Sequence, residues 1–120
     1  MSFLNKIKLK NKNVYILGGF GLIGSEVVKD ILSVGAKVII LDIKKGKMKK
    51  NVKYERFDCS KLNTLEKHFN KIVKKFECPD IFINCSYPKT NDWKQSSFSN
   101  VTLKRMTKNI EIHLNSYAWL

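Results

Sequence analysis

The sequence predicts an α/β fold, a doubly wound parallel sheet with helices on both faces. Short apolar runs of strand-forming residues alternate with longer segments whose apolar residues recur every three or four positions. In chain order the predicted elements are β-α-β-β-α-β-α, an alternation typical of parallel sheets. No internal repeat, Gly/Ser-rich linker or shift in composition marks a second domain. We therefore expect a single domain over residues 1–120.

The first three predicted elements follow a short basic arm. Asn13–Leu17 is a compact apolar run that ends on glycines, as buried parallel strands often do. Leu22–Val34 carries apolar residues at helical spacing, and Gly35 follows it at a position where helices often end in a left-handed residue. Lys37–Asp42 has four consecutive apolar residues and ends in an acid. The sequence therefore predicts strand, helix and strand.

A lysine-rich loop and a second helix come next. Residues 44–53 contain six lysines and no periodic apolar residues, which favours a solvated loop, with a polyanion-binding loop as the alternative. A third strand is expected near Val52–Phe57. The helix after it has Ser60 or Asn63 as its expected N-cap. Its apolar face consists of Leu62, Leu65, Phe69, Ile72, Val73 and Phe76.

The last predicted elements are a strand and a helix. Pro79 ends the second helix, and Asp80–Cys85 is a fourth apolar strand. A polar, irregular segment is expected over Tyr87–Asn100. The final twenty residues then have the spacing of a helix, with apolar residues at Val101, Leu103, Met106, Ile110, Leu114 and Tyr117.

The net charge of +13 raises the question of a nucleic-acid partner. Arginine, which favours base recognition and bidentate phosphate contacts, occurs only at Arg56 and Arg105, and all other basic residues are lysines. We therefore do not expect nucleic acid to be the main partner. The three cysteines, Cys59, Cys78 and Cys85, form no C-x-x-C pair. They predict neither a disulfide framework nor a zinc site, and they fit a reducing cytoplasm.

We expect no bound metal and no membrane association. His68 and His113 lack the i, i+4 spacing of a helical metal site. The N-terminal residues include lysines but no uninterrupted apolar stretch, and the most apolar segment, Val14–Gly24, contains four glycines. Neither a signal peptide nor a membrane span is therefore predicted.

A glycine-rich turn gives the strongest functional signal. Gly18–Gly24 reads GGFGLIG, and it contains both G-x-G-x-x-G and G-x-x-G-x-x-G between an apolar strand and an amphipathic helix. Glycines permit the tight turn and leave room for a pyrophosphate, which the free N–H groups at the start of the helix can bind. We therefore predict a dinucleotide site of the Rossmann type. The turn assigns to it Gly18, Gly19, Phe20, Gly21, Leu22, Ile23 and Gly24.

An acid at the end of the second strand predicts which dinucleotide is bound. Asp42 follows Gly24 by 18 residues, and there its carboxylate can accept hydrogen bonds from both ribose hydroxyls of the adenosine. The same negative charge repels a 2′-phosphate, so NAD is expected rather than NADP. Ile43 follows Asp42 and is included in the predicted site. Lys44 and Lys45 weaken the preference without reversing it.

The chain resembles the short-chain dehydrogenase/reductase family over nearly its whole length, although it covers only about the first half of what that family requires. Phe57–Ser60 resembles the family's D-[VL]-[TS] element, which implies that Asp58 and Cys59 border the adenine ring. Asp80–Tyr87 resembles the D-x-L-V-N-N-A-G element. The resemblance implies that Asn84, Cys85 and Ser86 line the cofactor. It also implies the sheet order 3-2-1-4.

The sequence departs from the family pattern at several positions. Leu17 replaces the usual threonine, and the glycine spacing is instead similar to that of the extended, sugar-nucleotide-modifying subgroup. His113 stands where a relay asparagine is expected. Asn84–Trp93 is most similar to a branch linked to bacterial surface-glycan modification. The family's catalytic Tyr-x-x-x-Lys pair does not occur in these 120 residues, so we assign no catalytic residue.

Three hypotheses remain open at this point. The first is the cofactor-binding half of an NAD-dependent oxidoreductase, whose small-molecule substrate would bind only in a complete parent protein. The second is half of a nucleotide-sugar epimerase or dehydratase, and the third is a non-enzymatic nucleotide- or polyanion-binding module. We also expect self-association, because the fourth strand would form an apolar sheet edge.

Overall fold

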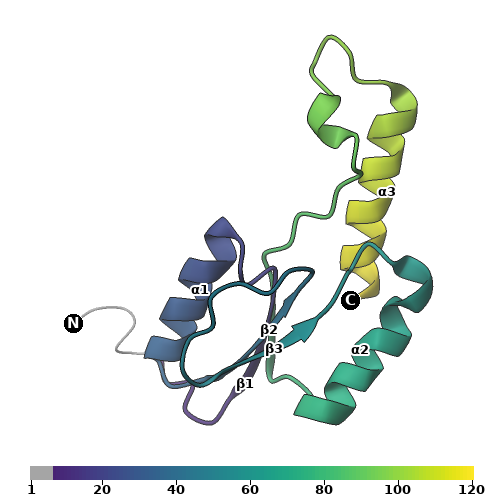
Figure 1. Cartoon of the computed structure of the whole chain (residues 1–120). Helices are drawn as coiled ribbons and strands as arrows, with labels where there is room; N and C mark the ends of the chain where they lie inside the picture. The colour runs from purple at the N-terminus through teal and green to yellow at the C-terminus, as the bar shows by residue number, and fades with distance from the viewer. Residues whose placement is uncertain (1–6) are drawn as a thin grey trace. The chain divides into compact units, whose positions relative to one another are not determined.

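The computed structural model describes residues 7–120 (Figure 1). The predicted basic arm lies partly in residues 1–6, outside the described residues. The described elements are β1 (Asn13–Leu17), α1 (Leu22–Ser33), β2 (Lys37–Asp42), β3 (Val52–Arg56), α2 (Leu62–Phe76), β4 (Ile81–Asn84), the short 3₁₀ helix η2 (Trp93–Gln95) and α3 (Leu103–Trp119). Every predicted strand and helix is present, with ends within two residues of those expected.

Two compact units make up the described chain. The first contains residues 7–57 and Asn70–Ser86, and the second contains Asp58–Phe69 and Tyr87–Leu120. Helix α2 begins in the second unit and ends in the first. The organisation of residues 1–120 as one domain stays a prediction.

The first unit is built on a four-stranded parallel sheet with the order β3-β2-β1-β4. This confirms the predicted order 3-2-1-4. In the sheet Leu17 lies opposite Leu41 on one side and Asn84 on the other. Because all four strands run in the same direction, the residues that follow them meet at one edge of the sheet. In α/β folds this carboxyl edge is where ligands bind.

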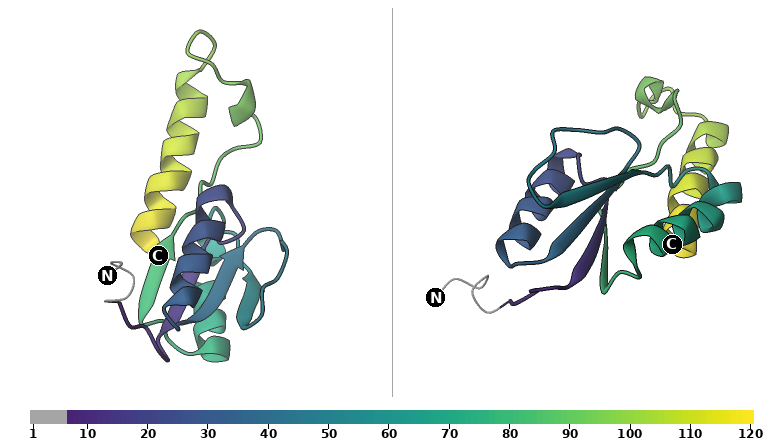
Figure 2. Two further views of the ribbon diagram at one scale, coloured as in Figure 1. Left: turned by 90° about the vertical axis from the view of Figure 1, so that its left-hand side faces the viewer. Right: turned by 60° about the horizontal axis from the view of Figure 1, so that its bottom comes forward.

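Strand β1 lies inside the sheet, between β2 and β4, and forms part of the core of this unit. All five of its residues are buried. Val14 and Ile16 pack with Val38 and Ile40 of β2 and with Val28 of α1, on the face of the sheet that α1 covers (Figure 2). The alternate residues of β1 and β2 point to the opposite face, as the two-residue period of a strand requires. The near-continuous apolar runs in the sequence follow from this burial on both faces.

The start of β1 is hydrogen-bonded to the segment between α2 and β4. The Tyr15 hydroxyl donates a hydrogen bond to the carbonyl of Glu77. Burial, with smaller contributions from Cys78 and Glu77, raises the pKa of Tyr15. The Asn13 side-chain amide donates to the carbonyl of Phe76 at 2.8 Å. These bonds satisfy polar groups that the core would otherwise leave unpaired.

Helix α2 confirms the predicted apolar face but not Asn63 as the N-cap. Every residue of that face is buried or half-buried, whereas the residues between them are exposed. The helix begins at Leu62, so Asn63 lies inside it and cannot be the N-cap. Ser60 instead donates from its N–H and hydroxyl groups to the carboxylate of Asp58. The local turn therefore uses Ser60, one of the two residues expected as the N-cap.

In the second unit, α3 buries polar residues and exposes apolar ones. Asn109 is 4% exposed and Ser116 is fully buried, whereas Leu103, Ile110 and Leu114 are 53–75% exposed. The buried groups are hydrogen-bonded: Asn109 donates to the Arg105 carbonyl at 2.9 Å, and Ser116 donates to the His113 carbonyl at 3.1 Å. Because these bonds offset desolvation, the helix can turn a polar face inward.

Candidate nucleotide-binding site

The glycine turn leaves β1 at the carboxyl edge of the sheet in the first unit. Gly18 has φ +75°, a left-handed conformation that favours glycine. A Cβ at this position would lie 2.9 Å from backbone atoms of Cys85 and Ser86, so the turn packs directly on the end of β4. The Gly18 N–H donates to the Leu41 carbonyl at 2.7 Å, and the Gly18 carbonyl accepts from Gly21 at 3.0 Å. The turn is therefore held from both neighbouring strands.

Helix α1 starts directly after this turn, against its backbone. A Cβ on Gly24 would lie 2.1 Å from the Gly18 carbonyl oxygen, so only glycine permits this approach. Gly21 is the N-cap, and the first turn of the helix carries no acidic residue. The first N–H groups of a helix have no intrahelical acceptor. Leu22 and Ile23 are 91% and 71% exposed, so the helix start faces solvent with donors suited to an anion.

Asp42 is hydrogen-bonded to the glycine turn. One carboxylate oxygen accepts from the Phe20 N–H at 3.0 Å, and the other accepts from the Lys44 N–H at 3.3 Å. Each carboxylate oxygen has a second lone pair, so the group can still accept bonds from a ligand. Ile43, the next residue, is 52% exposed. The structure thus places the predicted phosphate-binding turn and the predicted ribose acceptor in direct contact.

A small aromatic cluster next to Asp42 was not predicted from the sequence. The rings of Phe20 and Tyr54 lie 5.6 Å apart, and the Tyr54 hydroxyl donates to the Asp42 carbonyl at 3.3 Å. A Cβ on Gly46 would lie 2.6 Å from the Phe20 ring, so the lysine-rich loop folds across that ring. Phe20 therefore joins the site through its backbone, while its side chain anchors the loop. The only sequence signal was a glycine among lysines.

The end of β4 packs against the glycine turn. Cys85 donates its N–H to the Leu17 carbonyl at 2.8 Å. Burial raises the pKa of the Cys85 thiol, and the side chain packs against the apolar core of the sheet. The Asn84 side-chain oxygen accepts from the N–H of Ser86 at 2.9 Å and from its hydroxyl at 2.6 Å. These bonds fix the direction in which the chain leaves the strand.

Asp58 and Cys59 belong to the second unit and form the same kind of turn. The Asp58 carboxylate accepts from the N–H of Ser60 at 3.0 Å and from its hydroxyl at 2.6 Å. The matching tripeptides Asp58–Ser60 (DCS) and Asn84–Ser86 (NCS) thus give matching turns after β3 and β4. Cys59 is buried. The two tripeptides differ only in their first residue, and the turn that they share was not predicted from the sequence.

The predicted residues therefore fall into two sets. The first unit brings together the glycine turn, Asp42 and the segment Asn84–Ser86, whereas Asp58 and Cys59 lie in the second unit. Within residues 7–120 no cluster of three or more His, Cys, Asp or Glu side chains is placed to hold a metal ion. Over the same residues, no helix has the length and apolarity needed to span a membrane.

Sequence comparison gives one family match and a curated relative. Residues 14–114 match the sequence model of the NAD dependent epimerase/dehydratase family. The chain is 24% identical to the post-translational flagellin modification protein A of Campylobacter coli, over 91% of this chain and 47% of that protein. It therefore spans about half the length of this curated relative.

Solved structures show the same fold. A short-chain dehydrogenase from Leptospira borgpetersenii, solved with bound NAD+, matches with a TM-score of 0.74 and 26% identity over 98% of this chain and 45% of that one. The aldohexose dehydrogenase of Thermoplasma acidophilum matches at 0.73 and 18% identity, over 92% and 42%. An epimerase from Methanothermobacter thermautotrophicus matches at 0.62 and 21% identity, over 92% and 32%.

The fold, the glycine turn and these matches agree on one assignment. The family match covers most of the chain, and the glycine spacing at Gly18, Gly21 and Gly24 is the one the sequence shares with the sugar-nucleotide-modifying subgroup. The chain belongs to the NAD dependent epimerase/dehydratase family, the extended branch of the short-chain dehydrogenases/reductases.

Proposed function

We propose that this chain binds NAD(H) at the carboxyl edge of the sheet, with the pyrophosphate over the glycine turn and the adenosine ribose on Asp42. The observation that carries the proposal is the hydrogen bond from the Phe20 N–H to the Asp42 carboxylate at 3.0 Å. This bond holds an acceptor for sugar hydroxyls beside a turn with free backbone donors. A dinucleotide offers the two matching groups, a diphosphate and a ribose, on one molecule.

The charge of Asp42 favours NAD over NADP. A 2′-phosphate would approach the carboxylate that the ribose hydroxyls otherwise bind, and the two negative charges would repel each other. Lys44 and Lys45 weaken this preference without reversing it. Lys44 contacts Asp42 through its backbone N–H, and the Lys45 ammonium lies 6.0 Å from the centre of the Tyr54 ring.

The remaining predicted residues keep the roles that the family resemblance implies, as proposals. Asp58 and Cys59 are proposed to border the adenine, and Asn84, Cys85 and Ser86 to lie along the dinucleotide beyond the pyrophosphate. In this role the Asn84 amide is a positioning group, since its oxygen already holds Ser86. A preorganised backbone lowers the entropy that binding must remove.

We extend the proposal to the whole protein in general terms only. A protein with this cofactor half would transfer hydride between NAD and a small-molecule substrate, either as an oxidoreductase or as an epimerase or dehydratase. We propose a cytoplasmic location, which suits the three free cysteines, Cys59, Cys78 and Cys85.

The test is calorimetric titration of the 120-residue chain with NAD and with NADP. We expect measurable NAD binding that is tighter than NADP binding. In Asp42→Ala the NAD affinity should fall roughly tenfold or more, since hydrogen bonds to a charged acceptor contribute about 1.5–3 kcal/mol. NADP should lose less, because the repulsion is removed as well. Asp30→Ala, which removes an exposed carboxylate from α1, is the matched control and should leave both affinities unchanged.

Two results would contradict the proposal. Folded chain that binds no NAD at millimolar concentration would exclude the site itself. Equal losses for NAD and NADP in Asp42→Ala would show that Asp42 does not contact the ribose.

A further inference from the structure

Tyr54 of strand β3 lies next to the glycine turn although it is not part of it. It is paired with Ile40 of β2 in the parallel register, and both side chains pack in the core on the side of the sheet that α1 covers. A Cβ on Gly19 would lie 2.9 Å from the Ile40 side chain, so Ile40 contacts the turn. The Tyr54 ring contacts the next residue of the turn, Phe20, with ring centres 5.6 Å apart. Two adjacent strands therefore support the turn through side chains.

Phe20 is the residue through which a neighbouring side chain can hold this turn. Residues 18–21 read GGFG, so Phe20 is the one residue among them with a side chain that can pack. Glycine has the widest range of backbone conformations. Apart from its hydrogen bonds, the turn is therefore restrained by what the Phe20 ring contacts. Those contacts include the Tyr54 ring and the backbone at Gly46, where a Cβ would lie 2.6 Å from the Phe20 ring.

The position of Phe20 in turn fixes Asp42. The Phe20 N–H donates to the Asp42 carboxylate at 3.0 Å, so the carboxylate follows the backbone of the turn. Tyr54 also donates from its hydroxyl to the Asp42 carbonyl at 3.3 Å. That carbonyl accepts a shorter bond, of 3.0 Å, from the Phe57 N–H. Because the Phe57 bond remains when the hydroxyl is removed, the ring of Tyr54 matters more to Asp42 than its hydroxyl does.

The Tyr54 ring also contacts the lysine-rich loop. The Lys45 ammonium lies 6.0 Å from the ring centre, at the outer limit of a cation–π contact. An ammonium that is attracted to the ring is less free to pair with a 2′-phosphate. Removal of the ring should therefore act on both cofactors in opposite senses, by loosening the acceptor for ribose hydroxyls and by releasing a cation.

We propose, on the basis of the NAD site proposed above, that Tyr54 is a positioning residue that sets the preference for NAD over NADP. Its ring holds Phe20, and the Phe20 N–H holds the Asp42 carboxylate where the adenosine ribose binds. Tyr54 does not itself contact the dinucleotide. All the residues in this chain of contacts belong to the first unit.

The first measurement needs no nucleotide. Amide hydrogen exchange by NMR reports whether the Phe20 N–H stays bonded, and the Ile16 amide in the core reports general stability. In Tyr54→Leu the exchange of Phe20 relative to Ile16 should rise about tenfold. Tyr54→Phe keeps the ring and should retain most of the protection. Phe20→Leu, which removes the other ring of the pair, should repeat the Tyr54→Leu result at the same amide.

Phe76→Leu is the matched control. Phe76 is another half-buried aromatic residue of the first unit, and its ring lies 5.6 and 4.9 Å from the ammonium groups of Lys53 and Lys75. The same change of an aromatic ring to leucine at this position should alter overall stability without changing the exchange of Phe20 relative to Ile16.

The second measurement is the ratio of NAD affinity to NADP affinity, from calorimetric titration of the same variants. Tyr54→Leu should lower this ratio about fivefold or more, whereas Phe76→Leu should stay within about twofold of wild type. A double-mutant cycle tests the route through Asp42. In an Asp42→Ala background, Tyr54→Leu should change the contribution of the ribose acceptor no further, leaving the ratio within about twofold of Asp42→Ala alone.

The outcomes separate this role of Tyr54 from the NAD site itself. Unchanged relative exchange of Phe20 in both Tyr54→Leu and Phe20→Leu would overturn Tyr54 as a positioning residue, whatever the nucleotide affinities are. An equal fall in the affinity ratio in Tyr54→Leu and Phe76→Leu would assign the effect to stability and would overturn it as well. A wild-type chain that binds no NAD, with the Phe20 amide behaving as expected, would overturn the proposed function and the cofactor preference while leaving the contact between Tyr54 and the turn established.

Discussion

At the scale of single residues, the site depends on close approaches that leave no room for a side chain. Gly24 shows this most clearly, because its missing Cβ would lie 2.1 Å from the Gly18 carbonyl oxygen. The obstacle is backbone, which cannot move aside as a flexible side chain can. The same contact brings the start of α1 against the turn that we propose to bind the pyrophosphate.

Gly24→Ala should therefore destabilise the fold and weaken NAD binding together. We expect a loss of about 1–3 kcal/mol in the free energy of unfolding, the usual cost of overpacking, measured by urea denaturation. Ser25→Ala, one position further along the same helix, is the control and should stay within about 0.5 kcal/mol. Unchanged stability and NAD affinity in Gly24→Ala would show that the helix start does not pack on the turn as described.

The residue scale also shows what the sequence could not predict. The glycine spacing and the position of Asp42 predicted two parts of one site, because both follow strands that must end at the same edge. The contact between Phe20 and Tyr54 joins the glycine turn to strand β3, and the packing of two such distant residues has no local pattern in the sequence. For the same reason the glycine among lysines at position 46 did not by itself predict a contact with the Phe20 ring.

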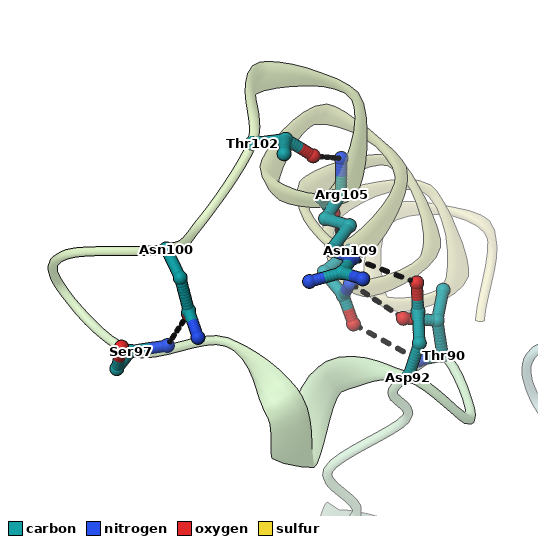
Figure 3. Close-up of polar contacts among 7 residues, drawn as sticks. All are labelled: Thr90, Asp92, Ser97, Asn100, Thr102, Arg105 and Asn109. Carbon is teal, nitrogen blue, oxygen red and sulfur yellow. Dashed lines mark hydrogen bonds and ion pairs between the residues drawn. The ribbon is translucent and has the colours of Figure 1, made fainter.

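At the scale of elements, strands and helices could be predicted because apolar periodicity is a local property. The predictions were wrong where polar side chains took an unexpected partner. Asp58 accepts a hydrogen bond from Ser60 and α2 begins at Leu62, so Asn63 lies inside the helix and is not its N-cap. In α3 the periodic apolar residues were easy to find, but the buried face is set by Asn109, whose partner Thr90 lies 19 residues away (Figure 3).

Asp80 links two strands, and its ionisation should contribute to their stability. Hydrogen bonds from the Asn13 N–H and from Lys12, each 2.8 Å long, lower the pKa of Asp80. A carboxyl whose pKa is lowered by folding stabilises the fold above its unfolded pKa, and this contribution is lost as the pH falls through the folded value. Asp80→Asn should therefore lose less stability than wild type between about pH 5 and pH 2.

Urea midpoints measured across that range provide the readout. Asp30→Asn, a change at an exposed carboxyl of α1, is the control and should follow the wild-type curve more closely. Identical acid dependence in Asp80→Asn and wild type would mean that the bonds at the start of β1 and β4 do not depend on the charge of Asp80.

At the scale of the whole molecule, the net charge of +13 opposes the association that exposed apolar surfaces favour. In the first unit β4 forms one edge of the sheet. In the second unit α3 exposes an apolar stripe, defined by Leu103, Met106, Ile110, Leu114 and Tyr117, with exposures of 40–75%. Sheet edges and apolar patches favour association with other chains, whereas like charge opposes it.

We propose that the chain self-associates and that salt strengthens the association, because salt screens the repulsion over a distance of about 10 Å at 0.1 M. Sedimentation velocity at low and moderate ionic strength should show a larger average mass at the higher salt. Leu114→Lys, which places a charge in the apolar stripe, should reduce that mass. Asn115→Lys adds the same charge at the neighbouring exposed position of α3 and should reduce it less, because only the first variant interrupts the apolar contact. A monomer at both salt concentrations would show that neither the β4 edge nor the stripe recruits a second chain, and equal effects of the two lysines would assign the change to net charge alone.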